Sequence, residues 1–159
     1  MKVGIISLGF SNIKSIVNAL NFLSIDSKII HKAGELKNYD TIILPGVGAF
    51  KNAIDNLHEL GFIEAIFNHV NREKKLIGIC LGMQLLFQES HEFGLNKGLG
   101  LIKGSVLPLD EKINLRVPHI GWNNVNTNMK EFLPFCGDYY FIHSFYCKPK
   151  HNKIVLFET

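Results

Sequence analysis

Residues 78–82 read Gly78-Ile79-Cys80-Leu81-Gly82 and place one cysteine between two glycines. The apolar run before this cysteine predicts a buried strand, and the residues after it predict a helix. A cysteine at such a turn is held in a strained conformation that exposes its side chain, the geometry of a nucleophile elbow. The nearby glycines let neighbouring backbone approach closely, and the start of a helix favours the thiolate. Cys80 is therefore a candidate nucleophile; the alternative is that both glycines only permit tight packing of a helix on a sheet.

Short apolar runs and helical stripes alternate on the N-terminal side of this turn. Strands are predicted at residues 2–8, 27–31, 41–44 and 76–79, and apolar stripes between them predict helices that begin near residues 13, 50 and 62. This alternation is typical of an α/β fold with a doubly wound, mostly parallel sheet. After the elbow, the apolar spacing predicts a packed helix through Phe87. Further β elements are predicted near residues 101–107, 116–125, 139–146 and 153–158.

The length and composition of the chain limit its organisation and its class. At 159 residues, the chain is long enough for one hydrophobic core and too short for two ordinary domains, so residues 1–159 are expected to form a single domain. A net charge of +3 does not indicate nucleic-acid binding, and the sequence has no apolar run of the length of a membrane span. Three cysteines without a Cys-x-x-Cys pair predict neither disulfides nor a metal site, which favours a reducing cytoplasm.

A second glycine-rich turn, Pro45-Gly46-Val47-Gly48, ends another predicted strand. In a parallel sheet, the loops at the carboxyl ends of strands meet where ligands bind. The turn is not a dinucleotide fingerprint because the third glycine is missing, and it is not a P-loop. It could present backbone N–H groups to negative charge that develops beside Cys80. The alternative is a simple turn without such a role.

These two turns belong to a larger set of motifs that occur in a recognisable order. The set consists of residues 44–50, 78–87, 98–102, 117–123 and 140–146. Together they resemble the class I glutamine amidotransferases and, more narrowly, the glutaminase subunit of imidazole glycerol phosphate synthase. The resemblance extends over essentially the whole chain and implies the flavodoxin-like fold of that family.

The resemblance implies a reaction and a set of roles. Cys80 would attack the side-chain amide of glutamine, forming a thioester and releasing ammonia, after which water would free glutamate. The oxyanion would be bound by Val47, Gly48 and Leu81, and the substrate by Gly46, Gln84, His143, Ser144 and Phe145. Judged without the family, Gln84 is simply a polar residue on a helix, and His143 a histidine near the end of a strand. No metal and no organic cofactor is implied.

The same resemblance implies a partner and a pathway. The ammonia would pass to a (β/α)8-barrel synthase, or cyclase, subunit in a cytoplasmic heterodimer. That subunit would form imidazole glycerol phosphate and an aminoimidazole carboxamide ribotide in histidine biosynthesis. Neither nucleic acid nor a membrane is an expected partner.

Two departures from the family pattern leave alternatives open. The triad base of the family is a histidine followed two residues later by a glutamate, and no His-x-Glu occurs after His143. The C-terminal part that carries this motif is thus expected to be missing, and the 159-residue polypeptide is expected to have little or no glutaminase activity.

Near the start, residues 7–12 read Ser-Leu-Gly-Phe-Ser-Asn in place of the family's Asp-Tyr-Gly-x-Gly-Asn. The alternatives are a paralogous subunit that supplies ammonia to a surface-sugar amidotransferase, an inactive binding subunit, and an unrelated cysteine hydrolase or redox protein.

Overall fold

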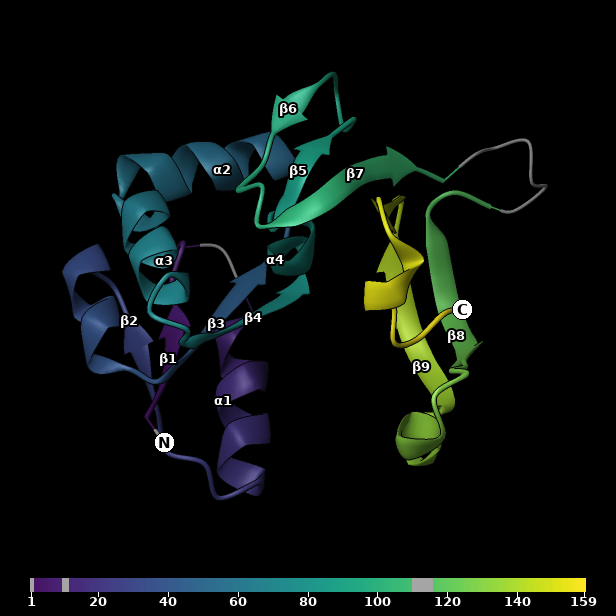
Figure 1. The fold of residues 1–159 in the computed structure, drawn as a ribbon, viewed down its shortest axis with the longest axis horizontal. Helices are drawn as coiled ribbons and strands as arrows, with labels where there is room; N and C mark the ends of the chain where they lie inside the picture. Colours follow the sequence, from purple (N-terminus) through teal and green to yellow (C-terminus); the bar gives the residue numbers. More distant parts are fainter. Residues whose placement is uncertain (1, 10–11, 110–115) are drawn as a thin grey trace.

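The N-terminal half of the protein contains a parallel sheet of four short strands, as the sequence predicts. A computed structural model describes residues 2–9, 12–109 and 116–159. The strands are β1 (Val3–Ile6), β2 (Ser27–Ile30), β3 (Thr41–Gly46) and β4 (Lys75–Cys80), arranged in the order β2-β1-β3-β4 (Figure 1). All three neighbouring pairs are parallel. The elbow therefore lies at the carboxyl end of a strand at one edge of this sheet.

Strand β3 is two residues longer than expected, because Pro45 and Gly46 continue the strand. Pro45 lies opposite Ile79, and Gly46 lies opposite Cys80. Beyond Ile43, β3 is paired with β4 alone. A proline is tolerated there because one side of the strand no longer needs a backbone donor.

Helices cover both faces of the sheet, which confirms the doubly wound architecture. Helix α1 (Ile13–Phe22) packs its apolar stripe on Val3, Ile5 and Ile43. On the other face lie the 3₁₀ helix η1 (Ala33–Asn38) and the helices α2 (Phe50–Glu59) and α3 (Phe62–Val70). Gly61, with a φ of 70°, separates α2 from α3, which agrees with the two helices predicted to begin near residues 50 and 62.

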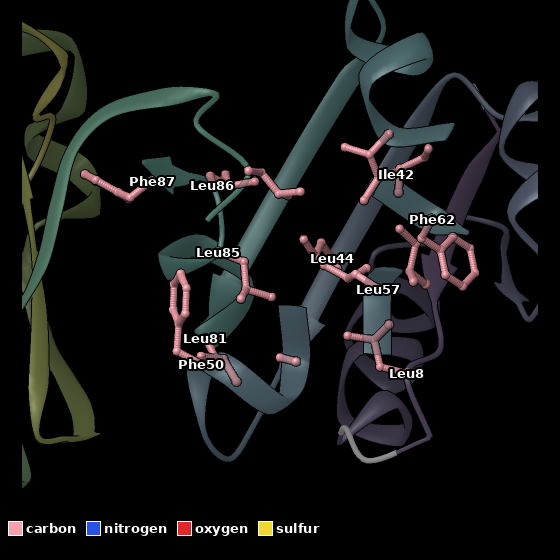
Figure 2. Close-up of a cluster of buried hydrophobic side chains, with 14 of the residues drawn as sticks. Leu8, Ile42, Leu44, Phe50, Leu57, Phe62, Leu81, Leu85, Leu86 and Phe87 are labelled. Carbon is pink, nitrogen blue, oxygen red and sulfur yellow. The ribbon is translucent and has the colours of Figure 1, made fainter. Parts of the chain in front are cut away.

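The main hydrophobic core joins this second face to the segment that follows Cys80 (Figure 2). Phe50 and Phe62 are fully buried, and so is Leu85 just beyond the elbow. Burying a side chain of this size contributes about 1.5–3 kcal/mol. Leu81, which directly follows Cys80, is also buried in this core. The core therefore anchors the elbow on its C-terminal side.

The C-terminal half adds a second sheet and a separate hairpin. After the short helix α4 (Leu81–Gln84), the strands β5 (Phe87–Ser90), β6 (Asn96–Lys97), β7 (Ile102–Pro108) and β10 (Phe145–Pro149) form a sheet in the order β10-β7-β5-β6. Strands β8 (His119–Val125) and β9 (Gly137–His143) pair with each other in antiparallel fashion, on the right in Figure 1. The 3₁₀ helices η3 (Lys130–Phe135) and η4 (Asn152–Ile154) complete the described elements.

The expected helix through Phe87 is wrong, because α4 is a single turn and Phe87 begins β5. Backbone hydrogen bonds explain the change. The carbonyls of Leu85, Leu86 and Phe87 accept N–H groups from Leu99, Ile102 and Gly100, respectively. Pairing with this distant glycine-rich segment therefore overrides the local helical periodicity. A one-turn helix also carries only a small dipole, so it supports a thiolate less than the longer helix would.

Two of the expected strands also differ from the structure. The segment 139–146 is divided at Ser144, which separates β9 from β10. The segment 153–158 is not a strand, since it contains the end of η4 and a single antiparallel bridge between Glu158 and Asn126. The segment 116–125 becomes a strand only from His119. Within the described residues, no helix has both the length and the apolar character needed to cross a membrane.

Candidate active site

Cys80 has the strained backbone expected of a nucleophile elbow. Its φ is 54° and its ψ is −119°. Residues other than glycine rarely adopt this backbone conformation. It is the last residue of β4 and comes directly before α4, and it is exposed. Strain of this kind costs roughly 1–3 kcal/mol and persists only where the surrounding structure enforces it.

The surrounding glycines enforce this conformation by letting α4 sit directly on β3 and β4. A Cβ atom on Gly82 would overlap the carbonyl oxygen of Leu44, which is backbone. A Cβ on Gly78 would lie 2.6 Å from the Cα of Met83, and one on Gly46 would lie 2.9 Å from the nitrogen of Gly82. The glycines on either side of Cys80 thus serve close packing, and the elbow depends on that packing.

The second glycine-rich turn lies beside the elbow, as expected for two loops at the carboxyl edge of a parallel sheet. Gly46 and Cys80 are direct neighbours across β3 and β4. Val47 and Gly48 follow in an exposed loop, and Gly48 has a φ of 93°. On the other side of Cys80, Leu81 opens α4, so its N–H has no acceptor within the helix.

Gln84 and the segment around Ser144 meet at one backbone carbonyl. The side-chain amide of Gln84 lies 3.5 Å from the carbonyl oxygen of Phe145, and Nδ1 of His143 lies 2.9 Å from the same oxygen. The Ser144 carbonyl accepts the N–H of Leu109 at 2.9 Å. Of the residues that the family resemblance assigns to the substrate, His143 and Phe145 are therefore linked through Gln84 to the helix that follows Cys80.

His119 is a neighbour of this group that the sequence did not point out as a site residue. Its Nδ1 lies 3.0 Å from Nε2 of His143, which faces it directly across β8 and β9. The His119 ring also stacks on Phe141, with ring centroids 5.6 Å apart. The available signal was a histidine in each of two segments that were predicted to be strands; their pairing could not be read from the sequence.

The three cysteines differ sharply in their environment. Cys80 is exposed, whereas Cys136 and Cys147 are half-buried. Burial, with a smaller contribution from the nearby Cys80, raises the pKa of the Cys147 thiol to about 12. Cys147 therefore stays protonated and unreactive at neutral pH.

Neither a hydrogen-bonded side chain nor a set of metal ligands accompanies Cys80 within the described ranges. Among residues 2–9, 12–109 and 116–159, no hydrogen bond joins the Cys80 thiol to a side chain. His119 and His143 are engaged with each other and with Phe145. The same residues contain no cluster of three or more histidine, cysteine or acidic side chains that could hold a metal ion.

Comparison with known proteins places the chain in a class. A model of the CobB/CobQ-like glutamine amidotransferase domain matches residues 9–131. A crystal structure of a glutamine amidotransferase shares the fold, with a TM-score of 0.76 and 20% identity, covering 99% of this chain and 79% of that one. The fold and this match define a glutamine amidotransferase domain.

Similarity to curated proteins narrows the family. Imidazole glycerol phosphate synthase subunit HisH of Caldanaerobacter subterraneus subsp. tengcongensis is 44% identical over 91% of this chain and 72% of its own length. The HisH subunit of Chlorobaculum tepidum is 38% identical over 99% of this chain and 80% of its own length. The chain belongs to the HisH family of imidazole glycerol phosphate synthase subunits. The family resemblance is thereby confirmed, and the alternatives outside this family are not favoured.

Proposed function

We propose that this protein is the glutaminase subunit of an imidazole glycerol phosphate synthase, hydrolysing L-glutamine to L-glutamate and ammonia for histidine biosynthesis. The observation that carries the proposal is the position of Cys80. It is an exposed cysteine with a φ of 54°, directly beside Gly46 at the carboxyl edge of the sheet. Membership of the HisH family supplies the reaction.

In the first step, Sγ of Cys80 adds to the carbon of the glutamine side-chain amide. The carbonyl oxygen becomes an oxyanion, for which the N–H of Leu81 and the loop at Val47 and Gly48 are the proposed donors. The C–N bond then breaks, ammonia leaves after gaining a proton, and a thioester remains on Cys80. Water hydrolyses the thioester and releases glutamate. Loss of one oxyanion donor typically costs about 10²–10³ in rate.

The substrate is held on both sides of Cys80. Gly46 lies across the sheet from the nucleophile and has no side chain that could block the approach of an amide. Gln84, His143, Ser144 and Phe145 are the proposed other wall, in which Gln84 and His143 both contact the Phe145 carbonyl. This arrangement supports their assignment as glutamine-binding residues.

The second component of the reaction is a cyclase subunit that receives the ammonia. The curated relatives are named as subunits of a synthase. The chain is also 41% identical, over 92% of its length, to the "Imidazole glycerol phosphate synthase hisHF, chloroplastic" of Arabidopsis thaliana. This match covers 25% of the Arabidopsis protein. We propose a cytoplasmic heterodimer with a (β/α)8-barrel cyclase.

Activity in the presence of the partner tests this function. The full-length protein, mixed with the cyclase subunit and its nucleotide substrate, is expected to convert glutamine to glutamate and to transfer the nitrogen to the cyclase product. The assay is a coupled enzymatic measurement of glutamate formation, which is compared with and without the cyclase subunit. A protein that stays monomeric beside the cyclase and hydrolyses glutamine freely without it would contradict the proposed partnership.

A further inference from the structure

Two half-buried histidines lie end to end beside the proposed glutamine site. Nδ1 of His143 is 2.9 Å from the Phe145 carbonyl, and a carbonyl only accepts, so this nitrogen carries a proton. In a neutral imidazole, the other nitrogen is then an acceptor. Nε2 of His143 faces Nδ1 of His119 at 3.0 Å, so Nδ1 of His119 is the donor. The tautomer of one ring thus determines that of the other.

The Phe145 carbonyl is available because of the register of its strand. Phe145 lies opposite Pro108, and the preceding Ser144 accepts the N–H of Leu109. Hydrogen-bonded and non-hydrogen-bonded pairs alternate along antiparallel strands. The carbonyl and the N–H of Phe145 therefore point away from β7, toward the side where none of the described strands lies beside β10. His143 and Gln84 occupy that carbonyl from the open side.

We propose that His119 is a positioning residue for glutamine binding. Its Nδ1–H holds the His143 ring, which in turn fixes the Phe145 carbonyl and the Gln84 amide at the wall of the substrate site. The inference rests on the proposed glutaminase function and adds to it a residue that does not itself touch the substrate. Stacking on Phe141 keeps the His119 ring in the orientation that this role requires.

Two substitutions separate the hydrogen bond from the packing of the ring. His119→Phe keeps an aromatic ring for Phe141 and removes the N–H. His119→Asn removes the ring and keeps an amide N–H at the same distance from the backbone as Nδ1. A purely structural role of the ring predicts that His119→Asn is the more damaging change, and the positioning role predicts the reverse.

The test uses the full-length protein with its cyclase partner. His119→Phe is expected to raise the KM for glutamine roughly tenfold, since it leaves Nε2 of His143 without a donor. Its kcat is expected to change less than about twofold, because a binding contact and not the chemical step is lost. His119→Asn is expected to restore most of the wild-type KM. An unchanged KM in His119→Phe, or a KM in His119→Asn that is equally raised, would overturn the proposal.

A spectroscopic measurement separates this inference from the proposed function. In protein labelled with ¹⁵N-histidine, the imidazole shifts are expected to place the proton on Nδ1 in both His119 and His143, with each signal assigned by its loss in a variant. This result does not depend on enzymatic activity. An inactive protein with these tautomers would therefore contradict the proposed glutaminase function and not the contact between His119 and His143. A proton on Nε2 alone in either ring would refute the positioning role.

Discussion

Replacing Cys80 with alanine is expected to lower glutamine hydrolysis by at least about 10⁴-fold, because the reaction would lose its proposed nucleophile and with it the thioester. Alanine also has a Cβ, so the substitution does not change the strain of the backbone at a φ of 54°. The measurement is glutamate formation by the full-length protein with its cyclase partner. The cyclase should still form product from added ammonium salts, since the variant retains the partner surface.

Cys147→Ala is the matched control for this prediction. Cys147 is half-buried, and its thiol has a pKa of about 12, so its removal is expected to change hydrolysis by less than a few-fold. If Cys80→Ala kept hydrolysis within tenfold of the wild type, Cys80 would not be the nucleophile. A loss equal to that of Cys80→Ala in the Cys147 variant would likewise contradict the assignment.

Gly82→Ala is expected to lower the free energy of unfolding by about 3 kcal/mol or more. The new methyl group would overlap the Leu44 carbonyl oxygen, and neither α4 nor β3 can yield without disturbing the core around Leu81. Overpacking of this kind typically costs 1–3 kcal/mol, and more when backbone must move. Urea-induced unfolding, followed by circular dichroism, measures the change.

Gly34→Ala provides the comparison for this substitution. Gly34 lies in η1, and a Cβ there would meet no atom within 4 Å apart from its chain neighbours and the backbone of its own helix. Its free energy of unfolding is expected to stay within about 0.5 kcal/mol of the wild type. Equal free energies of unfolding for the two variants would mean that α4 does not pack closely against β3.

The N-terminal half of the fold could be predicted from the sequence because its signals are local. Apolar runs that end in turn residues marked all four parallel strands, and the Gly-x-Cys-x-Gly pattern marked the elbow. The glycines at residues 46, 78 and 82 carry this information, since only glycine fits where α4 meets the sheet.

The C-terminal half could be predicted less well because its structure depends on contacts between distant residues. The segment after Gln84 has helical spacing, yet its backbone pairs with residues 99–102 and begins β5. The contact between His119 and His143 depends on the register of β8 and β9, which no local pattern specifies. The same holds for the Phe145 carbonyl, which points away from β7 because Phe145 and Pro108 form a non-hydrogen-bonded pair.

The reactivity of the cysteines toward a glutamine analogue that bears an electrophile is the most direct test of the central claim. We expect the full-length protein to be labelled at Cys80 alone, with peptide mass spectrometry identifying the site, and excess glutamine to slow the labelling. Exposure favours Cys80, and burial protects Cys147. Labelling of Cys136 or Cys147 in preference to Cys80, or labelling of Cys80 that glutamine does not slow, would contradict the claim that Cys80 is the nucleophile of a glutamine site.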